Sequence, residues 1–375
     1  MTLPQARPFT KFLVRAPYAP DHWPMFWSEE PSPELILENL RRHAEIASVG
    51  RIRFPGSLAQ KNRLWREYRN FLRQALSNFD GALSVSNRSA CLLYYYAMLN
   101  FAKAELLSAR PANILKGFVH HGLSFKPAGA KTVSGDHLTV KDGVFPWLYE
   151  LRTGKKLTPG TRLPIARLLR QIPEIGTQVI DANLGIPRIR PFQHAVVASP
   201  TESWTILLME EAPKPGTATA RLFRKNFQEV QPVPNWQVVF SMSQRVVGLR
   251  MFQSLNTVPI SNNGWDFEAT MRLTLEISDI ISRRTSEMSE ASLSPSLYES
   301  KMMVMPPALA RYAVTYYASS LVRYKPSSFD FQLYPAQAIL FDSIARECAL
   351  PMLIDTISGL EGRDHLFNSS ASLRA

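Results

Sequence analysis

The chain has 375 residues, of which 45 % are hydrophobic and 20 % charged, and its formal net charge is +12 at pH 7. The length suits one large domain or two to three ordinary ones, and the composition is that of a globular protein with a sizeable core. Two cysteines and the lack of any run of roughly 18 apolar residues exclude a disulfide-framed secreted fold and a membrane span, so we expect a cytoplasmic protein without a membrane partner.

Residues 1–31 repeat proline and aromatic residues, which predicts an extended arm that packs on the body of the protein. Ser32, Pro33 and Glu34 then suit the N-cap, the first turn and the positive end of a helix that runs to about residue 47. The next predicted helix, about 59–79, carries an arc of apolar residues at a spacing of 3.6 residues.

Four arginines lie beside that apolar arc, on a separate one: Arg63, Arg66, Arg69 and Arg73. From residue 41 to residue 73 the chain has nine lysines or arginines and only two acidic residues. The arc is either a solvated charged face or a stripe that binds a nucleic acid or an acidic protein, and both interpretations stay open.

The stretch "SACLLYYYAMLNFAKAELLSA", residues 89–109, is apolar on every side of a helix and too short to span a bilayer. It should therefore be the central helix of a bundle, with Cys91 as a buried free thiol. Tyr96, Asn100 and Lys103 share one face of this helix, since they are four and three residues apart.

A mixed pattern of short strands and short helices is predicted for residues 120–260. "HHGLSFKP" and "DHLTVKDGVFP" predict short strands, the second with a Lys-Asp-Gly turn, and short helices are expected at about 146–153 and 162–171. Further strands are predicted at "RPFQHAVVAS", "SWTILLME", "WQVVFSM" and "VVGLRMF", so we expect a partly antiparallel sheet in this insert.

Helices return at about 266–284, 306–324 and 335–358, separated by the Ser-rich linker "SEMSEASLSPSLYES" and followed by a frayed tail at 363–375. The predicted fold class is α+β, mainly α. We expect a helical bundle in which residues 261–362 pack on the helices of residues 32–119, with the mixed insert, residues 120–260, between these two parts in the chain.

The helix at 306–324 repeats the pattern of the central helix, with Tyr312, Tyr316, Ser319 and Arg323 on one face. Two apolar helices that each present tyrosines and one cation suit a shared anion-binding pocket. The alternative is that each cation closes a hydrogen-bond network in the core or pairs with a buried acid. Nucleotide-binding, metal-binding and hydrolase motifs are absent from the sequence, so no cofactor and no metal is expected.

The segments "YYYAMLNFAKAELL", "HHGLSF", "VKDGVFPWLYELRTG", "LLRQIPEIG" and "YYASSLVRYKPSSFDF" occur in an order that resembles the YaaC-like proteins of bacteria. The resemblance covers about residues 60–360 and matches Lys103, the His121–Gly122 pair and the Arg323–Tyr324–Pro326 motif. A tryptophan that usually follows the last motif is replaced here by Phe329 or Phe331. Because this family is largely uncharacterised, the resemblance implies architecture and little about activity.

The central helix also resembles those of HEPN domains, several of which are ribonucleases with an Arg followed four to six residues later by a His. Arg188 and His194 meet that spacing, but Pro191 lies between them and "HAVVAS" predicts a strand. We therefore expect a non-catalytic or ligand-gated binding module, in a bacterial defence or stress system, that acts as a homo-oligomer or as a subunit of a larger complex. The alternative is a HEPN-type ribonuclease.

Overall fold

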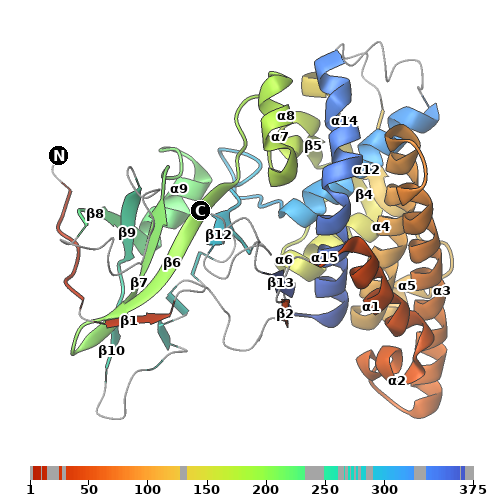
Figure 1. The fold of residues 1–375 in the computed structure, drawn as a ribbon, viewed down its shortest axis with the longest axis horizontal. Helices are drawn as coiled ribbons and strands as arrows, with labels where there is room; N and C mark the ends of the chain where they lie inside the picture. The colour runs from red at the N-terminus through yellow and green to blue at the C-terminus, as the bar shows by residue number, and fades with distance from the viewer. Residues whose placement is uncertain are drawn as a thin grey trace. The chain divides into compact units, whose positions relative to one another are not determined.

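A computed structural model describes residues 3–9, 11–14, 25–27, 31–126, 133–232, 249–260, 266, 269–270, 272–273, 276–277, 280–283, 290–324, 335–363 and 365–367. The chain forms two compact units (Figure 1). The helical unit comprises Pro31–Pro187 and Pro306–Gly362, and the β-rich unit comprises Met1–Glu30, Arg188–Met305 and Arg363–Ala375. The fold class is α+β and mainly α, which confirms the prediction.

Long helices make up most of the helical unit: α1 (Pro33–Glu45), α3 (Leu58–Leu83), α4 (Asn87–Ala109), α12 (Pro307–Tyr324), α14 (Pro335–Glu347) and α15 (Ala349–Glu361). Shorter elements connect them: α2 (Ala47–Gly50), α5 (Pro111–Ile114), α6 (Val144–Thr153), α7 (Ile165–Leu169), α8 (Gly176–Asp181) and the 3-10 turns η1 (Arg51–Arg53), η2 (Val133–Gly135) and η3 (Pro173–Ile175). None of the helices within the described ranges is long and apolar enough to cross a membrane.

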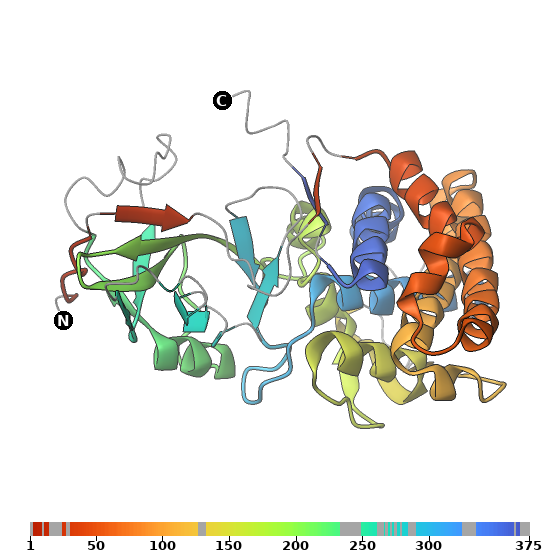
Figure 2. The ribbon, with the colours of Figure 1, turned by 90° about the horizontal axis from the view of Figure 1, so that it is seen from below.

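Helix α4 is the centre of the helical unit, as its apolar sequence predicts. It packs against α3, α12, α14, α15 and α6, so no residue from 90 to 102 is exposed. Seen from below, the N-terminal helices lie side by side with the C-terminal helix α15, which contacts both α1 and α4 (Figure 2). Cys91 on α4 is a buried free thiol, and so is Cys348.

Local signals in the sequence determine where these helices begin. The Ser32 hydroxyl accepts a hydrogen bond from the Leu35 amide at 3.2 Å, which caps α1. Ser57 and Gln60 form a capping box at the start of α3. The single helix expected over 335–358 is instead two, α14 and α15, because Pro351 lacks the amide hydrogen that would continue α14 past Cys348.

The β-rich unit has an antiparallel sheet of β6 (Arg190–Ala198), β7 (Glu202–Met209), β9 (Arg250–Ser254) and β8 (Phe227–Val230), in that order. The N-terminal segment forms backbone hydrogen bonds at both edges of this sheet. Strand β1 (Lys11–Val14) pairs with β6, and the amide of Ala6 donates to the carbonyl of Gln231, just after β8, at 3.0 Å. The start of the chain therefore bonds to β6 and also, beside β8, to the opposite edge of the sheet.

Both faces of this sheet are buried, which explains the continuous apolar run of β7. Trp204 and Ile206 pack with Ala6 in one core, whereas Leu207 packs in another with Phe223 of helix α9 (Ala218–Asn226). Smaller strands complete the unit: β10 (Val258–Pro259), β11 (Ile281–Arg283), β12 (Glu290–Leu293) and the parallel pair β2 (Met25–Trp27) and β13 (His365–Phe367).

Three more expected elements differ in the structure. The helix expected at 162–171 begins only at Ile165, because Arg162–Pro164 pair with residues 137–139 as a strand. Residues 281–283 and 290–293, expected in a helix and in a linker, are strands β11 and β12, and β12 pairs with β6. Pairing with an existing strand outweighs the weak β-propensity of these serine-rich segments. The segment "WQVVFSM", most of the tail and the residues Pro326, Phe329 and Phe331 lie outside the described residues.

Candidate anion-binding site

Three consecutive tyrosines of α4 point to three sides of the helix, because each residue of an α-helix turns by about 100°. The ring centre of Tyr94 lies 4.9 Å from that of Phe79 on α3, and the ring centre of Tyr95 lies 5.2 Å from that of Tyr316 on α12. Tyr96 points towards the end of α12. The tyrosine run therefore joins α4 to two different helices.

Arg323, in the last turn of α12, is held by aromatic groups. Its Nη1 donates to the hydroxyl of Tyr96 at 3.3 Å, and its Nε donates to the carbonyl of Ser319 at 3.3 Å. Its Cζ lies 5.7 Å from the ring centre of Tyr95 and 4.8 Å from that of Tyr324. Cation–π contacts of this kind attract the guanidinium without neutralising its charge.

His121 is brought to the same place by a small sheet of β3 (His121–Ser124), β4 (His137–Gly143) and β5 (Arg162–Pro164). Two glycines allow this strand pair to approach α6. Gly122 has a φ of +83° and Gly143 a φ of +137°, and a Cβ on Gly143 would lie 2.2 Å from the carbonyl oxygen of His120. The expected Lys-Asp-Gly turn is therefore wrong: these residues end β4, directly before α6.

The His121 ring lies against both helices. Its ring centre is 5.0 Å from that of Tyr316 and 6.4 Å from that of Tyr95. Its Nδ1 accepts a hydrogen bond from the Leu123 amide at 3.3 Å, so in the neutral ring Nε2 carries the proton. Burial, followed by the charge of Arg323, lowers the pKa of His121, and the ring is a neutral donor at pH 7.

Lys103 lies on the same face of α4, one turn from Asn100, and is half-buried. Its Nζ is 5.7 Å from the ring centre of Phe71, and burial lowers the pKa of the ammonium. Its charge also lowers the pKa of His121, which places the two groups within electrostatic range of one another. The Asn100 amide, in contrast, donates to the carbonyl of Tyr96 within α4 at 3.0 Å.

We call six residues the Arg323 cluster: Tyr95, Tyr96, His121, Tyr316 and Arg323, whose side chains are in contact, and Lys103, whose charge acts on His121. Within the described ranges, neither Arg323 nor Lys103 has a carboxylate within ion-pair distance. Of the residues predicted for a shared pocket, Tyr96, His121, Tyr316 and Arg323 lie together, whereas Lys103 contacts Phe71. The side chains of Asn100 and Ser319 donate to carbonyls of their own helices. Whether they bind a ligand stays a prediction.

Two other arginines of the helical unit, Arg152 and Arg311, are neutralised by carboxylates. Arg311 donates to Glu174 at 2.9 Å and to Asp355, and Arg152 forms an ion pair with Glu105 at 2.6 Å. We call these five residues the buried ion network. The sequence analysis missed it, although the apolar run around Arg311 was a usable signal, because a charge in such a run requires a partner.

A further polar group lies beneath the Arg323 cluster. The hydroxyl of Tyr312 is buried and has no hydrogen-bond partner among the described residues. The Tyr312 ring stacks on that of Tyr95 at a distance of 6.3 Å between ring centres. Burial raises the pKa of the Tyr312 hydroxyl well above its usual value, and the nearby Tyr95 and Tyr316 raise it by a smaller amount. A buried hydroxyl without an acceptor costs free energy, which a water or an anionic oxygen beside it would recover.

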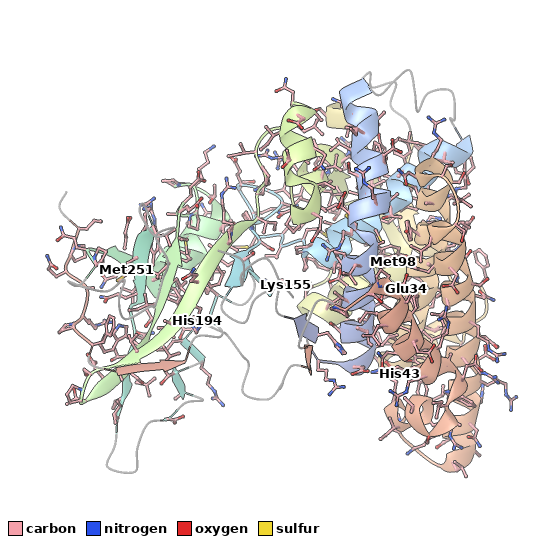
Figure 3. The ribbon with its side chains drawn as sticks, viewed as in Figure 1. Glu34, His43, Met98, Lys155, His194 and Met251 are labelled. Atoms are coloured by element: carbon pink, nitrogen blue, oxygen red, sulfur yellow. The ribbon has the colours of Figure 1, made fainter. Side chains whose placement is uncertain are left out.

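Arg188 and His194, the pair considered for ribonuclease chemistry, belong to the β-rich unit. The guanidinium of Arg188 donates to the carbonyls of Ser296 at 2.6 Å and Leu297 at 3.2 Å. His194 lies within β6 (Figure 3), where burial lowers its pKa to about 3. Neither environment favours the ribonuclease alternative, since the arginine bonds to backbone and the imidazole is enclosed in a sheet.

The predicted arginine stripe of α3 is divided in two. Arg69 and Arg73 both bind the carboxylate of Glu45, at 2.8 Å and 2.6 Å, and they lower its pKa to about 2, Arg73 more than Arg69. Arg63 and Arg66 are exposed and have no carboxylate partner within the described part of the chain. Binding of a polyanion by this stripe stays a prediction.

Comparison with models of known protein families gives a match to this chain. A family model described as YaaC-like Protein matches residues 55–334, about three quarters of the chain. The matched segment contains α4, β3 and α12, and therefore every residue of the Arg323 cluster. No match was found among curated proteins or among solved structures.

Proposed function

The chain belongs to the YaaC-like protein family, and we propose that it acts as a binding module that takes a small anionic ligand at the Arg323 cluster. One observation carries this proposal: among the residues that the structure describes, Arg323 and Lys103 have no carboxylate partner, whereas Arg152 and Arg311 of the same unit do. A half-buried cation with no acid beside it among those residues is suited to an acid supplied from outside.

The groups of the cluster suit an oxyanion. A guanidinium can grip a phosphate or carboxylate with two parallel hydrogen bonds, and an ammonium beside it adds a point charge. The hydroxyl of Tyr96 and the Nε2–H of His121 are further donors. These features support sulfate, phosphate or a phosphorylated metabolite as ligand.

Thermal-shift measurements with sulfate, phosphate and nucleoside phosphates test the proposal. We expect at least one of these anions to raise the melting temperature of the wild type, because a ligand at 100 times its Kd stabilises the folded state by about 2.7 kcal/mol. The variants Arg323→Met and Lys103→Met should lose this shift and should melt, without ligand, close to the wild type.

Arg66→Met is the matched control, since it removes one cation from the same unit at an exposed position. It should respond to the anion as the wild type does. The proposal fails if none of the anions shifts the melting temperature, or if Arg323→Met retains the full shift.

A further inference from the structure

One end of the helical unit, formed by α2, η1 and the start of α3, exposes aliphatic side chains. Ile52 is 81 % exposed, Leu58 is 64 % exposed and Ile46 is 41 % exposed. Both α2 and η1 contact α3, so these residues belong to one locally folded region. Single exposed apolar residues are ordinary, but three within a short segment are a feature that calls for a partner.

Unneutralised cations accompany these aliphatic side chains. Between residues 42 and 66 the chain has six lysines or arginines: Arg42, Arg51, Arg53, Lys61, Arg63 and Arg66. The single acidic residue of this segment, Glu45, is bound by Arg69 and Arg73 outside it. In the part of the chain that the structure describes, none of the six has a carboxylate partner. We call residues 42–66 the basic tip.

We propose that the basic tip is a peripheral contact site for an anionic lipid bilayer. Cations attract the headgroups, and aliphatic side chains that stand out from the surface can enter the boundary with the acyl chains. The expectation that the protein lacks a membrane partner rested on the absence of a spanning segment. A surface contact needs no such segment.

Two other anionic partners fit the basic tip less well. Single-stranded nucleic acids are bound by stacking bases on aromatic side chains, whereas the exposed apolar groups here are isoleucine and leucine. An acidic amphipathic helix requires an apolar groove. Ile52, at 81 % exposure, protrudes instead of lining a groove. A protruding aliphatic group in a segment rich in cations matches the bilayer interface.

Co-sedimentation of the full chain with phosphatidylcholine vesicles, with and without phosphatidylglycerol, tests this proposal. We expect binding only to the anionic vesicles, weakened by added salt. The double variant Ile52→Asn/Leu58→Asn should weaken binding on the order of tenfold or more, because it removes two aliphatic side chains from the interface. Ile186→Asn, at a position that is 54 % exposed, is the matched control and should bind as the wild type does.

Charge variants provide an independent measurement. Arg63→Gln/Arg66→Gln should weaken vesicle binding by roughly thirtyfold, since each of the two cations near an anionic surface contributes about 1 kcal/mol. Glu45→Gln should tighten it by releasing Arg69 and Arg73. Arg323→Met should leave vesicle binding unchanged, so this proposal and the anion-binding function can fail separately.

The same proteins are also tested with a single-stranded RNA oligonucleotide. Binding to RNA but not to anionic vesicles would identify the tip as a nucleic-acid surface and overturn the lipid proposal. Binding to neither probe would also overturn it, and so would wild-type vesicle binding by the Ile52→Asn/Leu58→Asn variant.

Discussion

The guanidinium of Arg323 donates to the hydroxyl of Tyr96 across 3.3 Å, although the two residues are 227 positions apart in the chain. This hydrogen bond joins the first and last segments of the helical unit through a polar contact instead of an ion pair. The charge of Arg323 is thereby positioned but not cancelled. The variants below separate positions that stabilise the fold from positions that should bind a ligand.

Arg311→Met should destabilise the protein by about 3–5 kcal/mol, because it removes the buried cation that pairs with the mostly buried carboxylates of Asp355 and Glu174. Burial already raises the pKa of Asp355, against the lowering effect of Arg311. Urea denaturation measures the loss. Arg346→Met removes an arginine that is 60 % exposed and should change the free energy of unfolding little. Equal effects at both positions would contradict a stabilising role for the buried ion network.

Affinity for sulfate should increase as the pH falls from about 7.5 to about 5.5, because an anion beside His121 favours the imidazolium and binding then takes up a proton. Calorimetric titration measures this affinity, and sulfate keeps its charge over the pH range.

In the ligand-free protein the pKa of His121 lies below its usual value of 6.5, so near that pH the unfolded chain binds more protons than the folded protein. Lowering the pH through 6.5 should therefore lower the free energy of unfolding.

His121→Gln is the control for this pH dependence. It keeps a donor at the site but does not titrate, so its sulfate affinity should stay flat with pH. A wild type whose affinity does not change with pH would show that His121 does not contact the anion.

Leu107→Ala should cost about 2–5 kcal/mol of unfolding free energy, because Leu107 is fully buried in the central helix and its truncation leaves a cavity. Leu99→Ala should cost less, since Leu99 on the same helix is only half-buried. Chemical denaturation of both variants checks the order. The reverse order would be inconsistent with the packing of α4.

Ala6→Asp should destabilise the β-rich unit by at least about 2 kcal/mol, because Ala6 is 6 % exposed in a core with Trp204 and its substitution buries a carboxylate. Faster hydrogen exchange in β6 and β8, the strands that the N-terminal segment joins, is the expected readout. Leu3→Asp, at a position that is 42 % exposed, is the control and should leave exchange in both strands unchanged.

Local patterns in the sequence predicted the long helices well. The cap at Ser32 and the all-round apolar character of α4 are encoded within a few residues, so local sequence was sufficient to identify them, whereas the cap at Ser57 was not predicted. The strands β11 and β12 were missed for the opposite reason. Their polar sequences form strands through pairing with each other and with β6, which no local pattern records.

The candidate site could be predicted in part. Spacing placed Tyr96 and Lys103 on one face of α4, and placed Tyr316 and Arg323 on one face of α12. Which cation has an acidic partner could not be predicted, because Arg311 is neutralised by Glu174, 137 residues away. The need for a glycine at position 122, next to His121, could not be predicted either, because a Cβ there would clash with Pro146 on α6, at 2.5 Å.

The order of segments along the chain has a consequence for how the protein is made. Helix α4 is synthesised well before α12, α14 and α15, so its apolar sides are without their cover while the β-rich segments emerge from the ribosome. Strand β2 likewise precedes its partner β13 by nearly the whole chain. Neither unit is contiguous. We therefore expect a nascent chain that stops before α12 to expose Tyr95 and Tyr96, which contact α12 in the folded protein, to chaperones and proteases.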